Sequence, residues 1–443
     1  SHPSATPSDL VRVYRKISDC YFQKGLLREA MAFLQSAESH CDPHDDIERA
    51  SLAVRRGFIL LEHGEFEKDL KQAVSAFGTL RLTDEHREVA KAQVLMANCY
   101  FRLGKHTEAE QYFLDALSSF RRINDGVGEA NILNNLGLFH KNACRWGRSL
   151  DFLKRALLLC DELGLTQVRV RVTLNLGIVY LKKREFSEAS STLANARMMA
   201  RQTGNDLKYA RATLMLGVAE TRTGNLTAAE KHLLEARVLG ERRSYKREIA
   251  LADEFLGDLM LERGDLDGAK ENYTIALSAA KKISPRGDIV AEVLRRMAHL
   301  SLLENDPEGA VKTGLRAIDV AQHCGEVHEI GFAERTIGLA YALMRKNGEA
   351  EEHIKSSVST FLRMNNQYQA HRSTYMLGEY LQKRQERQAW IKSKKLLEDA
   401  MSFFERNEDY GEMAEGHFLL AKVDRSLENR DECLLHLFEA QRL

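Results

Sequence analysis

The chain repeats itself at an interval of about 40 residues. The segment Asn-Ile-Leu-Asn-Asn-Leu-Gly at 131–137 returns at 171–177 as Arg-Val-Thr-Leu-Asn-Leu-Gly. Each copy precedes a second amphipathic segment that carries an alanine, Ala156 in the first and Ala196 in the second. A fixed interval of this length indicates a chain that is built by stacking one structural unit on the next.

One small residue marks the same place in every repeat, and we call it the register residue. The eleven register residues are Ser18, Gly57, Ala97, Gly137, Gly177, Gly217, Gly257, Ala298, Gly338, Gly378 and Ala421. Successive intervals lie between 39 and 43 residues. A turn former usually follows seven positions later, and alanines follow at twelve and nineteen positions. Each set of small residues falls on one helical face, so every repeat is predicted to form two closely packed helices, A and B.

The composition favours an all-α chain without a strong overall charge. Only 5 prolines and 28 glycines occur among 443 residues, which leaves little room for strands or long linkers. The 64 basic and 64 acidic residues cancel, so net charge attracts neither nucleic acid nor an anionic membrane. No apolar run approaches the roughly 20 residues that cross a bilayer, and residues 1–9 lack a secretion signal, which predicts a cytoplasmic protein. The seven cysteines contain no Cys-x-x-Cys pair, which indicates reduced thiols.

The repeat resembles the tetratricopeptide repeat. That family's Leu-Gly-x-x-Tyr and Ala-x-x-x-Phe-x-x-Ala elements have counterparts here at 176–180 and 109–116. The interval is longer than the usual 34 or so residues, and it is similar to that of kinesin light chain, the Leu-Gly-Asn-repeat adaptor, and bacterial activator and peptide-sensing arrays. The resemblance implies an α-solenoid of eleven helical hairpins in which the A helices line a concave groove.

The predicted organisation is one solenoid over residues 11–443. Residues 1–10, with Pro3 and Pro7, are expected to be a disordered leader or an artificial remnant. The tenth repeat fits the register only if three extra residues around Glu386 to Trp390 lie in its turn. The chain ends after helix B of repeat eleven, whereas solenoids usually end in a polar cap. This predicts a piece of a longer protein or a last helix that packs on a partner.

Patterns that indicate catalysis or metal binding are sparse. Two clusters contain metal-ligand residue types, namely His40, Cys41 and His44, and His323, Cys324 and His328. Both lie at predicted turns between repeats, where polar residues are solvated, and zinc needs three or four converging ligands. We interpret them as solvated turns. The chain lacks the Gly-x-x-x-x-Gly-Lys-Ser/Thr, Gly-x-Ser-x-Gly and His-Glu-x-x-His motifs. We expect no enzyme activity, no metal and no cofactor.

Comparison of helix A across repeats three to six predicts a binding groove. Two largely basic rows stand six residues before and five after the register residue: Lys91, Asn131, Arg171 and Arg211, and Arg102, Asn142, Lys182 and Arg222. Two mostly apolar rows stand three before and one after it: Val94, Asn134, Leu174 and Leu214, and Asn98, Leu138, Ile178 and Val218. Two residues before it stand Asn135 and Asn175, and the family resemblance implies that such asparagines bind the backbone of an extended peptide.

The sequence therefore predicts a non-catalytic protein-interaction scaffold. Rows of Arg and Lys complement carboxylates, so we expect an acidic peptide segment with apolar side chains. The alternative function is a sensory region of a larger bacterial signalling or transcription regulator that responds to a ligand or peptide. The rows could also be ordinary solvated helix faces, although apolar residues between them argue against this. RNA binding is disfavoured by the zero net charge and by Glu254, Asp258 and Glu262 in repeat seven.

Overall fold

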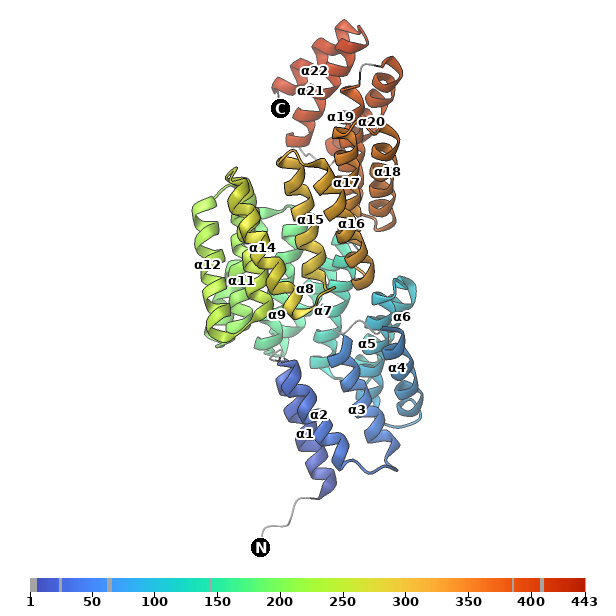
Figure 1. Ribbon diagram of the computed structural model, residues 1–443. Helices are drawn as coiled ribbons and strands as arrows, with labels where there is room; N and C mark the ends of the chain where they lie inside the picture. The colour runs from blue at the N-terminus through green and yellow to red at the C-terminus, as the bar shows by residue number, and fades with distance from the viewer. Residues whose placement is uncertain are drawn as a thin grey trace. The chain divides into compact units, whose positions relative to one another are not determined.

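Helices account for nearly all of the chain in the computed structural model (Figure 1). The structure describes residues 6–23, 26–61, 66–143, 145–384, 386–406 and 410–442. Over these ranges it contains 22 α-helices and no strand, so the predicted all-α class is confirmed. The chain divides into two compact parts, Ser1–Glu248 and Ile249–Leu443, which we describe separately. The prediction of one continuous solenoid stays a prediction.

The N-terminal part contains six complete helical hairpins. Its helices are α1 (Pro7–Gln23), α2 (Leu27–His40), α3 (Asp46–Leu60), α4 (Phe66–Leu80), α5 (His86–Arg102), α6 (His106–Arg122), α7 (Gly126–Asn142), α8 (Trp146–Glu162), α9 (Thr166–Lys183), α10 (Phe186–Gln202), α11 (Asp206–Arg222) and α12 (Leu226–Arg243). Odd-numbered helices are the A helices and even-numbered ones the B helices. Consecutive A helices, such as α7, α9 and α11, also contact each other, whereas consecutive B helices do not do so comparably among the described residues. The A helices therefore form an inner layer.

The C-terminal part continues the hairpin pattern. After α13 (Lys246–Glu262), which begins in the N-terminal part, come α14 (Leu266–Ile283), α15 (Asp288–Leu303), α16 (Pro307–Cys324), α17 (Val327–Leu343), α18 (Asn347–Arg363), α19 (Gln367–Gln382), α20 (Arg387–Arg406), α21 (Tyr410–Ser426) and α22 (Arg430–Arg442). The sequence predicts that the three extra residues of repeat ten lie in its turn, and this prediction is wrong. They lengthen helix α20 to 20 residues. The segment after Glu386 lacks Gly and Pro, so helix continues through it.

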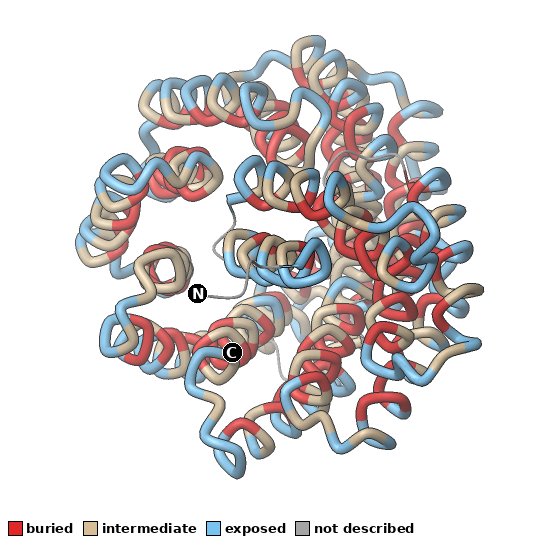
Figure 2. Tube along the Cα trace, turned by 90° about the horizontal axis from the view of Figure 1, so that it is seen from below, coloured by how far each residue is buried: buried red, intermediate tan, exposed pale blue. Residues whose placement is uncertain are grey.

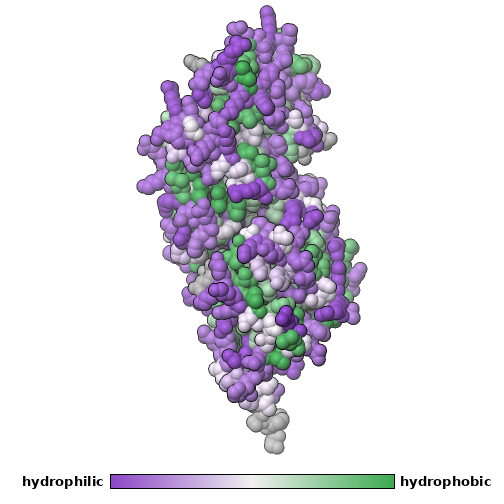
Figure 3. Space-filling view, turned by 90° about the vertical axis from the view of Figure 1, so that its right-hand side faces the viewer, coloured by the Kyte–Doolittle hydropathy of each residue, from purple (hydrophilic) through white to green (hydrophobic). Residues whose placement is uncertain are grey.

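Buried residues lie on the sides of helices that face other helices (Figure 2). Hydrophilic side chains cover most of the face in Figure 3, and the hydrophobic areas between them are broken up. Among the described residues, no helix is both long enough and apolar enough to span a membrane.

Part of the predicted disordered leader is helical. Helix α1 begins at Pro7, and residues 1–5 lie outside the described residues. The Thr6 hydroxyl donates to Asp9 Oδ2 at 2.7 Å and accepts from the Asp9 backbone N–H at 3.2 Å. Proline suits the first helical position because it has no N–H to leave unpaired. These contacts form an N-terminal cap, which explains the early start.

The register glycines allow helices A and B of one repeat to approach closely. A Cβ atom added at Gly137, Gly177 or Gly217 would lie 2.6–2.7 Å from the leucine sixteen residues later. For Gly177 that leucine is Leu193, which is fully buried. The side chain of helix B thus fills the space that glycine leaves on helix A.

We predict that Gly177→Val destabilises the N-terminal part by about 1–3 kcal/mol, because the new side chain overlaps Leu193. Gly147→Val on α8 is the matched control, since a Cβ there meets nothing within 4 Å. Urea unfolding followed by circular dichroism measures both variants. Equal unfolding midpoints for the two variants would contradict the close-packing explanation.

Candidate functional site

One face of each inner helix presents four residues, at positions six and two before the register residue and one and five after it. These spacings of four, three and four residues keep the side chains on one helical face. The set comprises Asn131, Asn135, Leu138 and Asn142 on α7, Arg171, Asn175, Ile178 and Lys182 on α9, and Arg211, Met215, Val218 and Arg222 on α11. We call it the inner stripe. In every helix the first three residues are half-buried and the fourth is exposed, and α9 contacts both α7 and α11.

The row three residues before the register residue does not form a groove floor. Leu174, Leu214 and Asn134 are at most 3% exposed, and Val94 is 8% exposed. Leu174 packs in the core with residues of α10 and α11, including Leu193. This part of the prediction is wrong because the position points between helices and not out of the inner layer. The row one residue after the register residue, including Asn98 on α5, is half-buried, as a surface lining requires.

The predicted asparagines link neighbouring inner helices. Asn175 Nδ2 donates to Asn134 Oδ1 at 2.8 Å, and Arg171 Nη2 donates to Asn131 Oδ1. Among the described residues, the Asn135 side chain makes no hydrogen bond. Asn175 is therefore positioned by Asn134, which is buried, and the Asn135 amide keeps its donors and acceptor for a ligand.

Most of the basic rows are already matched within the protein. Lys91 Nζ lies 3.1 Å from Glu88 Oε1, and Arg211 Nε lies 2.6 Å from Glu248 Oε1. Arg102 lies over the ring of Phe66 at 5.7 Å from its centroid. These contacts leave much less unmatched positive charge on the inner layer than the sequence rows predicted.

Arg171 is different from the other basic residues of these rows. Its side chain contacts the amide of Asn131, its Nε is buried without a hydrogen bond, and it has no ion pair with any described carboxylate. Burial lowers the pKa of its guanidinium. A guanidinium without a carboxylate in a half-buried position is costly to the fold unless a ligand compensates it.

The sequence comparison missed Lys208, which lies on α11 one turn before Arg211. Burial, Arg211 and Arg171 together lower the pKa of its amine to about 7, and Glu248 opposes them. Its side chain has no hydrogen bond or ion pair among the described residues. The sequence signal that could have found it is the residue type at the position nine residues before the register residue.

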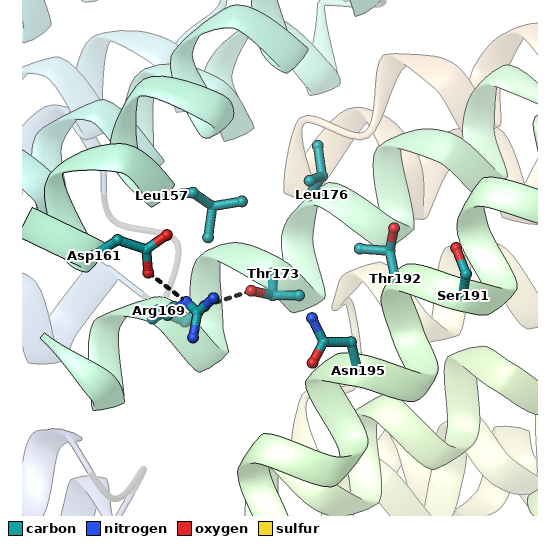
Figure 4. A pocket seen from close by; sticks show the side chains of 8 residues that line it. All are labelled: Leu157, Asp161, Arg169, Thr173, Leu176, Ser191, Thr192 and Asn195. Atoms are coloured by element: carbon teal, nitrogen blue, oxygen red, sulfur yellow. Dashed lines mark hydrogen bonds and ion pairs between the residues drawn. The ribbon is translucent and has the colours of Figure 1, made fainter. Parts of the chain in front are cut away.

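A hollow of about 250 Å³ lies between α8, α9 and α10, as Figure 4 shows. Its lining includes Leu157, Thr173, Leu176 and the ion pair of Arg169 with Asp161, whose atoms are 2.7 Å apart. These α9 residues lie on a different face of the helix from the inner stripe. The arginine is neutralised and the hollow is small and open, so we do not assign it as the site.

The two histidine–cysteine clusters make local contacts. His40 Nδ1 lies 2.8 Å from the Ser36 carbonyl oxygen, and His328 Nε2 lies 2.9 Å from Asn366 Nδ2. His328 also packs edge-on against the rings of Phe332 and Phe361. Within the described parts of the chain, no group of three or more His, Cys, Asp or Glu side chains is placed to hold a metal ion.

Two segments of the chain match family models, both described as tetratricopeptide repeat: residues 88–163 and residues 174–245. They cover most of repeats three to six, which carry the inner stripe. The repeats in these two segments are tetratricopeptide repeats.

One curated relative is the regulatory protein RapG of Bacillus subtilis, which is 27% identical over 161 residues. The match covers 35% of this chain and 44% of RapG, so it spans less than half of that relative. Solved structures share the fold of these tetratricopeptide repeats. A Rap protein complexed with competence and sporulation factor has a TM-score of 0.60 at 14% identity, covering 80% of this chain and 98% of the other. NprR in complex with its cognate peptide NprX has a TM-score of 0.52 at 13% identity, with 80% and 98% coverage.

We predict that Lys208→Gln stabilises the N-terminal part at low pH by about 1–2 kcal/mol, because it removes a buried like-charge contact. The folded-state pKa of Lys208, about 7, lies below its ordinary value of 10.5. The protonated amine therefore destabilises the fold fully below pH 7, and this cost declines as the pH rises toward 10.5.

Thermal unfolding of wild type and Lys208→Gln at pH 6 and pH 9.5 tests this prediction. The gap between their midpoints should be largest at pH 6 and should shrink by more than half at pH 9.5. A gap that is absent, or that grows with pH, would show that Lys208 does not carry this cost.

Proposed function

We propose that this protein is a non-catalytic interaction scaffold whose inner stripe binds an extended peptide segment of a partner. The observation that carries the proposal is the inner stripe itself. Three adjacent helices present half-buried apolar side chains, namely Leu138, Ile178 and Val218, flanked by amides and cations. Apolar side chains that remain accessible beside polar ones are typical of surfaces that bind a polypeptide.

The amides of the inner stripe suit an extended backbone. A carboxamide offers both a donor and an acceptor, which match a peptide unit without demanding a particular sequence. The hydrogen bond to Asn134 already orders the Asn175 side chain, so peptide binding costs less conformational entropy at this residue. The complex of NprR with its cognate peptide, in a chain of similar fold, adds support for a peptide ligand.

We still propose that the protein prefers an acidic peptide, but with fewer cations responsible for that preference. Because Lys91 and Arg211 already pair with glutamates, the proposed attraction rests on Arg171, Lys182 and the missed Lys208. A carboxylate placed near these side chains gains more than one near a cation that is already paired.

A regulatory role is the second candidate, and the match to a protein named as regulatory favours it. In this version the same inner stripe binds a peptide, and the repeats transmit the event to an attached or partner domain. Small-angle scattering with and without a bound peptide separates the two roles. A change in the radius of gyration favours the regulatory version, and an unchanged radius favours the plain scaffold.

We predict that the double variant Asn135→Ala plus Lys182→Glu lowers the affinity for peptides selected from a displayed random-hexapeptide library by about tenfold or more. Neither side chain makes a hydrogen bond or ion pair with the described residues, so the fold should be unaffected. Fluorescence anisotropy with labelled peptides measures the affinities.

The control is Lys154→Glu, the same charge reversal at an exposed position on the B helix α8. It should leave affinity unchanged. Unchanged binding of every selected peptide by the double variant would rule out the inner stripe as the binding surface.

A further inference from the structure

Five of the ten junctions between successive A helices carry an ion pair of one kind among the described residues. An arginine of one repeat contacts a glutamate that lies nine residues before the register residue of the next repeat. The pairs are Arg15–Glu48, Arg55–Glu88, Arg211–Glu248, Arg295–Glu329 and Arg372–Glu412. Four of these have closest printed distances of 2.6–2.8 Å. The carboxylate at this position therefore neutralises the cation of the preceding helix.

At the junction of repeats five and six, this position carries Lys208. Arg171 stands six residues before its register residue, as do Arg211 and Arg372, which reach Glu248 and Glu412 in the next repeat. The equivalent partner of Arg171 on α11 is thus a lysine, and α9 and α11 are in contact (Figure 1). Two cations meet where the other pairs supply a cation and a carboxylate.

We propose that Arg171 and Lys208 form a carboxylate-binding subsite, in which the ligand supplies the carboxylate that this junction lacks. This inference rests on the proposed peptide-binding function and specifies one of its contacts. A glutamate at position 208 would neutralise Arg171 and favour the fold, so a lysine there lowers stability in exchange for an anion site. Charge-assisted hydrogen bonds from a guanidinium and an ammonium to one carboxylate are among the stronger polar contacts in proteins.

The charges around Lys208 support this reading. It faces Arg171 from α9, Arg211 from its own helix and Glu248 from α13, and both arginines lower the pKa of its amine. On the neighbouring B helices, Arg197 of α10 and Glu235 of α12 pair with each other at 2.8 Å. Glu248, the carboxylate that faces Lys208, already pairs with Arg211 at 2.6 Å. A bound carboxylate would favour the protonated amine, so affinity for it should fall as the pH rises above about 7.

The variant Lys208→Glu tests this subsite independently of the rest of the inner stripe. The substitution should raise the thermal midpoint by forming the missing ion pair with Arg171, and it should remove the carboxylate preference. Lys154→Glu on the B helix makes the same charge change and is the control. Both variants and the wild type are used to select from two random-hexapeptide libraries at pH 6.5.

The two libraries distinguish the source of the carboxylate. One has a free C-terminus, and the other has an amidated C-terminus, so that only Asp or Glu side chains can supply the group. The wild type and the control should either retain more peptide from the free-C-terminus library than from the amidated library, or select an acidic residue at a fixed position, by about tenfold over Lys208→Glu.

The outcomes test the subsite and the inner stripe separately. If the wild type selects peptides without any carboxylate preference, or if Lys208→Glu shows the same preference, the subsite is overturned and the inner stripe remains the proposed binding surface. Failure of the wild type to retain any peptide would overturn the proposed function, and the peptide subsite with it.

Discussion

The close approach of two helices at each register residue is the contact on which the rest of the structure depends. Gly177 leaves no side chain between α9 and α10, and Leu193 occupies that space. Because the same arrangement recurs every 40 residues or so, each A helix is presented to its neighbours in nearly the same orientation. A face such as that of Asn175, Ile178 and Lys182 is consequently repeated side by side along the inner layer.

This geometry gives the described part of the chain an accessible inner surface that combines apolar and polar side chains. The apolar side chains of the inner stripe are half-buried, because one side of each packs against neighbouring helices and the other side faces outward. The polar residues beside them are largely matched within the protein, as in the Arg211–Glu248 pair. Arg171 and Lys208 are half-buried cations without an ion pair to a described carboxylate, so the proposed ligand carboxylate gains most at these two positions. A scaffold built of repeats can thus acquire specificity by changing single residues at one junction.

The sequence was sufficient to predict the fold, because small residues at fixed intervals leave one way to pack a helical hairpin. It located the inner stripe because equivalent positions in a repeat share a face. It could not separate Leu174 and Leu214, which are buried, from Ile178, which is half-buried, because all three are apolar and near the same face. The neutralisation of Arg211 by Glu248 and the importance of Lys208 depend on contacts between repeats, which the comparison of a few positions did not include.

Hydrogen–deuterium exchange of the wild-type chain, with and without a peptide selected from a random library, tests the central claim most directly. The account predicts slower exchange in the inner helices α7, α9 and α11 on peptide addition, with little change in the outer helices α8, α10 and α12. Protection confined to the outer helices, or to neither layer of repeats three to six, would contradict the claim that the inner stripe is the binding surface.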